Sequence, residues 1–267
     1  MTHPYFDLPT PLILGHRGAA GVAPENTLAS FARGLSDGAH MLESDVHVTR
    51  DGVPVLIHDP EVDRTTEGHG AVIDLDLAEL QDLDAGWAFE SNAAEGFPFR
   101  GQGIRVPSLR EAFEAFPESA FNLEIKAPEK ELVPEVLKLV RDFEREDRTL
   151  LVAGDDGIQA RLREEIRLSG TAPALGASLA DIVEIVRAAS EGKPHASDSM
   201  AIQVPLDFAG NRLITPLLID HCHGQNVQVH VWTINEAATM RELLDLGVDG
   251  IVTDLPGVMA QVVAGAA

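Results

Sequence analysis

The sequence predicts one α/β barrel built from eight βα units, with a small insertion after a hairpin on its second strand. The chain has 267 residues, which is close to the usual length of such a barrel. Short aliphatic and β-branched segments alternate with amphipathic helical segments, as in a parallel sheet made of βα units. Nine strand segments can be identified, and two of them must form a hairpin. Eight parallel strands remain, the number in a (β/α)8 TIM barrel.

The strand segments are residues 12–15, 41–48, 53–58, 121–126, 150–154, 174–177, 201–204, 227–233 and 250–253. The second and third are joined only by Thr49-Arg50-Asp51-Gly52, whereas a parallel crossover needs about a dozen residues. These two segments therefore form an antiparallel hairpin. If it turns near Asp51, the numbers of facing residues sum to about 102 or 103.

Helices are predicted between the strands from the spacing of apolar residues. The spacing is helical after Pro24 and after Ser108. Further helices are predicted over residues 132–145, 158–167, 180–189, 215–225 and 236–246.

Residues 59–107 are rich in Gly, Asp and Pro and are too long for an ordinary connection. They are predicted to form an insertion over one end of the barrel, with a small apolar core of Leu75, Leu77, Leu80 and Leu83. The whole chain, residues 1–267, is predicted to be a single catalytic domain.

Composition and charge argue against several classes of protein. Apolar residues make up 45%, and no apolar segment approaches the roughly 20 residues that span a bilayer. The net charge of −23 would repel nucleic acids and anionic lipid surfaces. We therefore expect no nucleic-acid partner and no membrane insertion, while a homo-oligomer is left open. Residues 1–15 lack the basic and apolar regions of a signal peptide, so a cytoplasmic location is expected.

Candidate functional residues lie at the carboxyl ends of the predicted strands, where parallel barrels carry their sites. The first strand ends in Gly15-His16-Arg17-Gly18. On the second strand, Glu43 and Asp45 are two residues apart and therefore point to the same face. The hairpin returns His58 to the neighbourhood of these two carboxylates. Two histidines and two acids are thus expected to converge on one mouth of the barrel.

Glu124 and Lys126 add a third carboxylate and a second cation to the same mouth. They lie two residues apart on another strand and share one of its faces. Three carboxylates with no Cys nearby suit a hard cation such as Mg²⁺ or Ca²⁺ better than zinc. Glu43, Asp45 and Glu124 are therefore the predicted metal ligands.

A purely structural interpretation of these charged residues is the alternative. The same residues could form a buried salt-bridge network of Glu43, Asp45, Glu124, Lys126 and Arg17 with no catalytic role. We favour the metal site because three separate strands supply the charges.

Four further residues were assigned from their positions in the pattern. Trp232 is expected at the rim of the mouth, with a core position as the alternative. Asp254, Asn26 and Glu25 were interpreted as structural, Asp254 as a cap of the following turn or helix.

Segments along nearly the whole chain resemble the glycerophosphodiester phosphodiesterases. They are Gly15-His16-Arg17-Gly18, Pro24-Glu25-Asn26-Thr27, Glu43-Ser44-Asp45-Val46, Asp51-Gly52-Val53-Pro54-Val55-Leu56-Ile57-His58-Asp59, Arg64-Thr65-Thr66, Pro107-Ser108-Leu109, Glu124-Ile125-Lys126, Val231-Trp232-Thr233-Ile234-Asn235 and Gly247-Val248-Asp249-Gly250-Ile251-Val252-Thr253-Asp254-Leu255-Pro256.

The resemblance implies an α/β barrel that hydrolyses glycerophosphodiesters to glycerol 3-phosphate and an alcohol through a cyclic phosphate. It implies that His16 and His58 are the acid/base pair and that Arg17 and Lys126 bind the phosphate. Glu43, Asp45 and Glu124 would hold one divalent cation, Mg²⁺ or Ca²⁺. Trp232 is a hypothetical apolar wall for the glycerol carbons.

Two segments depart from the family pattern. The family often has Ser-Phe where this chain has Gly154-Asp155, and Gln203-Val204-Pro205 matches no family signature. Both are expected to touch the leaving alcohol, whose identity therefore stays open.

Two other functions remain as alternatives. One is a related phosphodiesterase acting on lysophospholipids or phosphoinositides, which the acidic composition and the expected lack of an exposed aromatic or basic patch disfavour. The other is a binding module without turnover, which the retained histidines and carboxylates disfavour.

Overall fold

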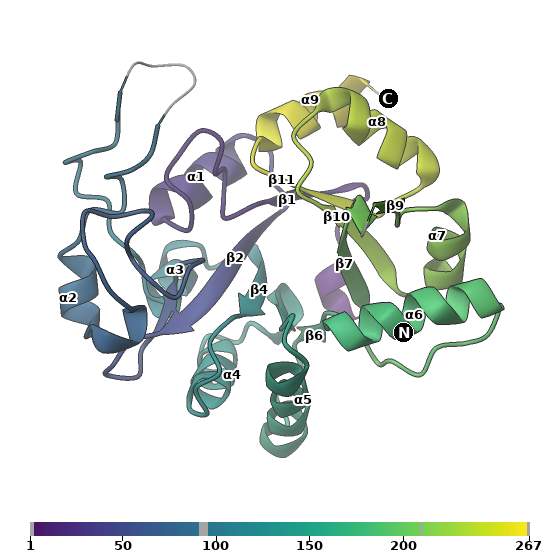
Figure 1. Cartoon of the computed structure of the whole chain (residues 1–267), viewed down its shortest axis with the longest axis horizontal. Coiled ribbons are helices and arrows are strands. Elements are labelled where there is room, and N and C mark those ends of the chain that lie inside the picture. Colours follow the sequence, from purple (N-terminus) through teal and green to yellow (C-terminus); the bar gives the residue numbers. More distant parts are fainter. Residues whose placement is uncertain (1–2, 91–95, 209, 266–267) are drawn as a thin grey trace.

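The computed structural model describes residues 3–90, 96–208 and 210–265. Within these residues, eight parallel strands wrap into a barrel (Figure 1) in the order β6-β5-β4-β2-β1-β11-β10-β7. A parallel bridge between Gly176 and Ala201 joins the two ends of the sheet. The predicted TIM barrel is therefore confirmed. Its strands are β1 (Leu12–Gly15), β2 (Met41–Val48), β4 (Ala120–Ile125), β5 (Thr149–Val152), β6 (Ala174–Leu175), β7 (Ala201–Pro205), β10 (Gln228–Trp232) and β11 (Gly250–Thr253).

The remaining predicted strand, β3 (Pro54–Leu56), pairs antiparallel with β2. The facing residues are Val46 and Leu56, His47 and Val55, and Val48 and Pro54, whose numbers sum to 102. The hairpin and its register are thus as predicted. Because the register is fixed, the chain that follows β3 returns beside the carboxylates of β2.

Helices surround the barrel (Figure 1). The last of them, α9 (Pro256–Gly265), was not predicted, and the ends of the others differ by only a few residues from those predicted. Side-chain caps start several of them: Thr27, Ser108 and Ser178 each accept a hydrogen bond from a backbone N–H of the first turn. The helices are α1 (Leu28–Ser36), α3 (Leu109–Ala115), α4 (Leu132–Asp142), α5 (Asp156–Ser169), α6 (Leu179–Glu191), α7 (Pro216–His223), α8 (Ala237–Leu246) and α9 (Pro256–Gly265). Short 3-10 turns are η1 (Pro4–Phe6), η2 (Val72–Asp74) and η3 (Glu146–Arg148).

Alternation along the strands separates an outer core from an inner one. Leu42 and Val46 of β2 pack against the surrounding helices, whereas Met41 belongs to the cluster that fills the barrel interior. Tyr5 of η1 joins this inner cluster, and its hydroxyl donates to the Met41 sulfur at 3.1 Å. Cys222, in α7, is buried.

The predicted insertion, residues 59–107, contains η2 and α2 (Leu77–Gln81), and α2 lies at the edge of the barrel near β2 (Figure 1). Its apolar residues pack with Val55 of β3. Leu80 is buried there together with Val62 and Val72. Leu75, Leu77 and Leu83 are partly buried and pack against them. The predicted small apolar core therefore forms. Residues 91–95 of this segment lie outside the described residues, and the extent of the single domain stays a prediction.

A short hairpin that was not predicted follows β7. Its strands are β8 (Asp207–Phe208) and β9 (Asn211–Arg212). It places Phe208 in the lining of a cavity beside α6.

Candidate active site

A cavity of about 160 Å³ lies at the mouth of the barrel, where the parallel strands end. The eight residues that the sequence singled out all line it: His16, Arg17, Glu43, Asp45, His58, Glu124, Lys126 and Trp232. Asn122, Gln203 and Val252 complete the lining. The structure thus brings together every predicted site residue, while their chemical roles remain predictions.

A tight turn after β1 presents His16 and Arg17 to the cavity. Arg17 has a left-handed φ of 49° and Gly18 a φ of 92°. A Cβ atom at Gly18 would come within 2.5 Å of the Ser30 backbone, so the turn accepts only glycine there. The Arg17 backbone N–H donates to Glu43 Oε2 at 2.9 Å. This bond ties the turn to the neighbouring strand.

His16 is held by a carboxylate from the far end of the chain. Its Nδ1 lies 2.6 Å from Asp254 Oδ1, and the other oxygen of Asp254 accepts from Asn235 Nδ2 at 2.6 Å. Burial alone would lower the pKa of His16, but the bond to Asp254 and the nearby Glu43 carboxylate raise it above its ordinary value. The interpretation of Asp254 as a purely structural cap was therefore incomplete, because this residue orients His16.

His58 has an equivalent partner next to it in sequence. Its Nδ1 lies 2.6 Å from Asp59 Oδ1. Arg64 holds the other oxygen of Asp59 at 2.5 Å and also binds Glu25, which accepts from Arg17 Nη1 at 2.8 Å. A continuous chain of ion pairs therefore links Arg17 to His58. Glu25, which was interpreted as structural, belongs to this chain.

Two of the three predicted metal ligands, Asp45 and Glu124, are paired with cationic side chains. Lys126 Nζ lies 3.3 Å from Asp45 Oδ1 and 2.9 Å from Glu124 Oε2, and Arg17 Nε lies 3.4 Å from Asp45 Oδ2. Burial, with a further contribution from the Asp45 carboxylate, raises the pKa of Glu43 to about 7. The salt-bridge network considered from the sequence therefore forms among Arg17, Lys126, Asp45 and Glu124, and Glu43 joins it through the backbone N–H of Arg17.

Asn26, also interpreted as structural, is hydrogen-bonded to one of the predicted metal ligands. Its Nδ2 donates to Asp45 Oδ2 at 3.1 Å, and its Oδ1 accepts from Ser44 Oγ at 2.6 Å. Asn26 has a φ of 56° and is buried. It therefore fixes one orientation of the Asp45 carboxylate.

The chemistry of the donors fits a hard divalent cation. Three carboxylates converge, burial and the neighbouring Asp45 carboxylate raise the pKa of Glu43, and the buried Asn122 Oδ1 has no hydrogen-bond partner among the described residues. Across the part of the chain that is described, no three His, Cys, Asp or Glu side chains already stand in a metal-binding arrangement.

Trp232 ends β10 at the rim of the mouth, and 44% of it is exposed. The alternative, a Trp in the core, is therefore wrong. His230, two residues earlier, points into the barrel and is fully buried.

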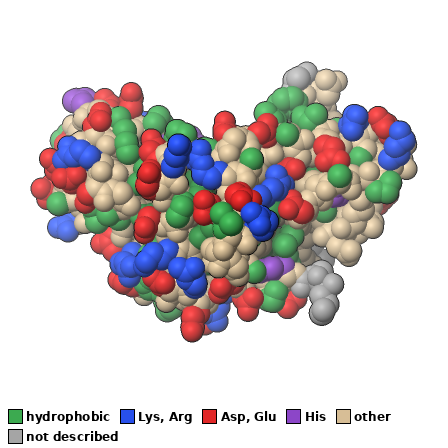
Figure 2. Space-filling model, turned by 90° about the horizontal axis from the view of Figure 1, so that it is seen from below, with side chains coloured by type: hydrophobic (Ala, Val, Ile, Leu, Met, Phe, Trp, Pro, Cys, Tyr) green, Lys and Arg blue, Asp and Glu red, His purple; other side chains and the backbone are tan. Residues whose placement is uncertain are grey.

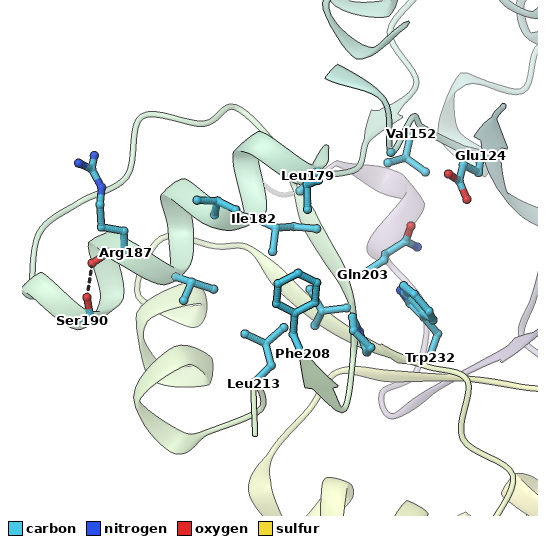
Figure 3. A pocket seen from close by; sticks show the side chains of 16 residues that line it. Glu124, Val152, Leu179, Ile182, Arg187, Ser190, Gln203, Phe208, Leu213 and Trp232 are labelled. Carbon is cyan, nitrogen blue, oxygen red and sulfur yellow. Dashed lines mark hydrogen bonds between the residues drawn. The ribbon is translucent and has the colours of Figure 1, made fainter. Parts of the chain in front are cut away.

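A second, larger cavity of about 600 Å³ adjoins the first. Glu124, Gln203 and Trp232 line both cavities (Figure 3). Phe208 and Trp232 are exposed on it, so the expectation that the chain has no exposed aromatic patch is wrong. Trp232 was expected at the rim of the mouth, whereas Phe208 could not be recognised as exposed from its local sequence.

The two segments that depart from the family pattern lie at this second cavity. Gly154, Gln203, Val204 and Pro205 line it. Asp155 instead caps α5 by accepting from the backbone N–H groups of the first turn. Its side chain is therefore committed to the helix.

Basic side chains are dispersed over the surface. On the face seen in Figure 2, Lys and Arg side chains lie in small groups among Asp and Glu. Among the described residues, no helix is both long enough and apolar enough to cross a bilayer.

Comparison with known proteins agrees with this site. The model of the glycerophosphoryl diester phosphodiesterase family matches residues 16–258. A glycerophosphodiester phosphodiesterase of Caldanaerobacter subterraneus is 33% identical, over 94% of this chain and 97% of that protein. The mouse (Mus musculus) lysophospholipase D GDPD1 is 29% identical, over 91% of this chain and 83% of that protein.

Solved structures give the same result. A phosphodiesterase of Oleispira antarctica in complex with the product sn-glycerol-3-phosphate superposes with a TM-score of 0.78 and 25% identity, covering 98% of this chain and 99% of that one. A glycerophosphodiester phosphodiesterase of Agrobacterium tumefaciens has a TM-score of 0.75 and 25% identity, covering 94% and 99%. With the matched segments, the barrel and the site in agreement, the chain belongs to the glycerophosphoryl diester phosphodiesterase family.

Proposed function

We propose that this chain hydrolyses glycerophosphodiesters to glycerol 3-phosphate and an alcohol, using one divalent cation, Mg²⁺ or Ca²⁺. The observation that carries the proposal is the pair of histidines at one cavity, each held at 2.6 Å by its own aspartate. Three carboxylates and two cationic side chains line the same cavity. Phosphodiester cleavage needs these groups: cations for the phosphate oxygens and an acid/base pair for the two hydroxyls.

Arg17 and Lys126 are the proposed phosphate-binding groups. Burial would lower the pKa of the Lys126 ammonium, but Asp45 and Glu124 raise it, so Lys126 stays charged at neutral pH. Both cations would neutralise oxygens that otherwise repel a nucleophile. This local charge explains how a chain of net charge −23 could bind an anion.

Glu43, Asp45 and Glu124 are the proposed ligands of the cation. When bound, it would neutralise a phosphate oxygen and lower the pKa of the attacking hydroxyl. Its charge would also offset that of the Asp45 carboxylate, which together with burial, the larger cause, raises the pKa of Glu43.

In the first step, the glycerol hydroxyl next to the phosphate ester attacks phosphorus. His16 accepts its proton, the bond to the alcohol oxygen breaks, and His58 protonates the departing alcohol. The products are the free alcohol and a cyclic glycerol phosphate. Because the nucleophile belongs to the substrate, its attack is favoured entropically.

In the second step, the histidines exchange roles. His58 accepts a proton from water as the water attacks the cyclic phosphate, and His16 protonates the glycerol oxygen that leaves. Glycerol 3-phosphate results, and both histidines regain their starting states. Asp254 and Asp59 would stabilise each imidazolium as it forms.

Trp232 is the proposed apolar wall for the glycerol carbons, since its exposed ring borders the catalytic cavity. A cytoplasmic location and a role in lipid or glycerol metabolism belong to the same proposal, as does the absence of nucleic-acid partners.

The test follows glycerophosphocholine turnover by phosphorus NMR for wild type, His16→Gln and His58→Gln. Each variant should lose about 10²- to 10⁴-fold in rate, with fold and metal binding intact. His69→Gln is the matched control, because His69 forms a 2.8 Å pair with Asp63 away from the site. Near-normal rates for either site variant would overturn the assignment of the acid/base pair.

An analogue that lacks the hydroxyl next to the phosphate ester tests the cyclic intermediate. The wild-type protein should bind this analogue without cleaving it. Normal cleavage would mean that water attacks directly. Binding of all substrates without any turnover would instead identify a binding module.

A further inference from the structure

The larger cavity beside the active site is apolar and is continuous with it. Figure 3 shows Glu124, Gln203 and Trp232 at one end and Arg187 and Ser190 at the other. The stretch between them is lined by aliphatic and aromatic side chains, among them Leu179, Ile182, Phe208 and Leu213. A ligand held in the catalytic cavity can therefore extend into this space past Trp232.

Helix α6 has a wide apolar surface, one edge of which forms a wall of this cavity. Ile185, Ala188 and Ala189 are buried in the core, and Ile182 and Val186 pack partly buried against it while also lining the cavity. Leu179 and Val183 extend this apolar surface along the cavity at helical spacing and are 53% and 59% exposed. A surface helix needs to bury only one apolar stripe to pack on a barrel, so these two side chains are available to bind a ligand.

The exposed apolar side chains of the molecule concentrate here. Of the nine large hydrophobic side chains that are exposed in the described parts of the chain, four line this cavity: Leu179, Val183, Phe208 and Trp232. A contiguous exposed apolar surface of this kind marks a binding site more often than chance exposure.

Gln203 stands where the two cavities meet. Its Nε2 is buried and has no hydrogen-bond partner. A buried donor without an acceptor is costly unless a ligand supplies one. A carbonyl oxygen between the glycerol and a hydrocarbon chain would lie at the right place to accept this bond.

The opposite side of the mouth is charged. In the strand order, β2 and its partner β3 lie across the barrel from β7, which carries Gln203. Asp59 and Arg64 surround His58 on that side. The site is therefore amphiphilic, with a polar side at the proposed acid for the leaving alcohol and an apolar side at Trp232.

We propose that the preferred substrates are monoacyl glycerophosphodiesters, in which the acyl chain on the glycerol occupies the α6 cavity and the polar alcohol leaves on the His58 side. This inference rests on the proposed function. It assigns Leu179, Val183 and Phe208 to binding of the chain and Gln203 to the acyl ester. It also places the glycerol half, instead of the leaving alcohol, beside Gly154 and Gln203.

The test compares choline release from glycerophosphocholine with release from its hexanoyl, octanoyl and decanoyl monoesters, all kept below micelle-forming concentrations. For wild type, kcat/KM should rise with chain length, by up to about fourfold for each methylene removed from water. In Val183→Glu, the preference for the decanoyl ester over glycerophosphocholine should fall at least tenfold. Leu217→Glu is the matched control, because Val183 and Leu217 are each 59% exposed and Leu217 lies outside the cavity.

Binding without turnover separates the two proposals. With a chelator present, calorimetry should show that the decanoyl ester binds wild type and Leu217→Glu more tightly than it binds Val183→Glu. If this binding result were found but choline were released from none of the substrates, the proposed hydrolysis would be contradicted and the proposed binding of the acyl chain would stand.

Three outcomes would overturn the inference. The first is a kcat/KM that does not depend on chain length. The second is an equal loss of the preference for the decanoyl ester in Val183→Glu and Leu217→Glu. The third is a preference only for a diester whose leaving alcohol is decanol. The last would assign the cavity to the alcohol.

Discussion

Replacing Asp254 with Asn tests how the fold prepares His16. The substitution keeps the shape of the side chain but removes the charge 2.6 Å from His16 Nδ1, in a pair of which only 19% and 24% of the two side chains are exposed. A hydrogen bond to a charged partner contributes about 1.5–3 kcal/mol, and 1.36 kcal/mol corresponds to one pKa unit. The pKa of His16 should therefore fall by about one to two.

Histidine NMR titration measures this directly, with His16→Gln used to assign the resonance. Asp249→Asn is the control, because it changes another His–Asp pair, that of His223, and should leave the pKa of His16 unchanged. An unchanged or increased pKa in Asp254→Asn would refute the reasoning.

The sign of the effect on stability follows from the raised pKa of His16. A raised histidine pKa stabilises the folded state fully below the unfolded value of about 6.5 and loses this effect as pH rises through the folded value. The unfolding free energy lost in Asp254→Asn should therefore be larger at pH 6 than at pH 9.

Three other predictions concern the core, the rim and the metal site. Arg145→Ala should destabilise the fold by about 3 kcal/mol or more, because the buried guanidinium donates to three backbone carbonyls. Thermal unfolding measures this loss, and Arg141→Ala is the control, because Arg141 is exposed and its replacement should leave the stability almost unchanged. Trp232→Ala should raise KM by about tenfold and change kcat less; steady-state kinetics with an unchanged KM would contradict a substrate contact. Glu43→Gln should weaken Mg²⁺ or Ca²⁺ binding at least tenfold by calorimetry, and unchanged affinity would remove it from the ligand set.

The barrel, the hairpin and the convergence of the site residues were predictable because each follows from a local pattern. Strand alternation places Glu43 beside Asp45, and a four-residue link forces the hairpin that returns His58. The carboxyl ends of parallel strands then meet at one mouth.

The supporting residues could not be assigned because their partners are distant in sequence. Asp254 reaches His16 across the contact between β1 and β11, and Glu25 meets Arg64 from the insertion. Nothing near either residue distinguishes it from an ordinary cap or loop acid.

The apolar cavity was missed for a different reason. The apolar residues of α6 are consistent with a helix packed in the usual way, and only the tertiary structure shows that Leu179 and Val183 remain exposed beside its buried face. The short β8–β9 hairpin, which brings Phe208 to the cavity, has too few residues to give a strand pattern.

Release of glycerol 3-phosphate from glycerophosphocholine, glycerophosphoethanolamine and glycerophosphoglycerol tests the central claim most directly, with each assayed in Mg²⁺, in Ca²⁺ and with a chelator. The account predicts release that requires one of the two cations and is abolished by the chelator. Undiminished release in the chelator would contradict the metal-dependent site, and no release from any diester with metal binding intact would contradict the proposed hydrolysis.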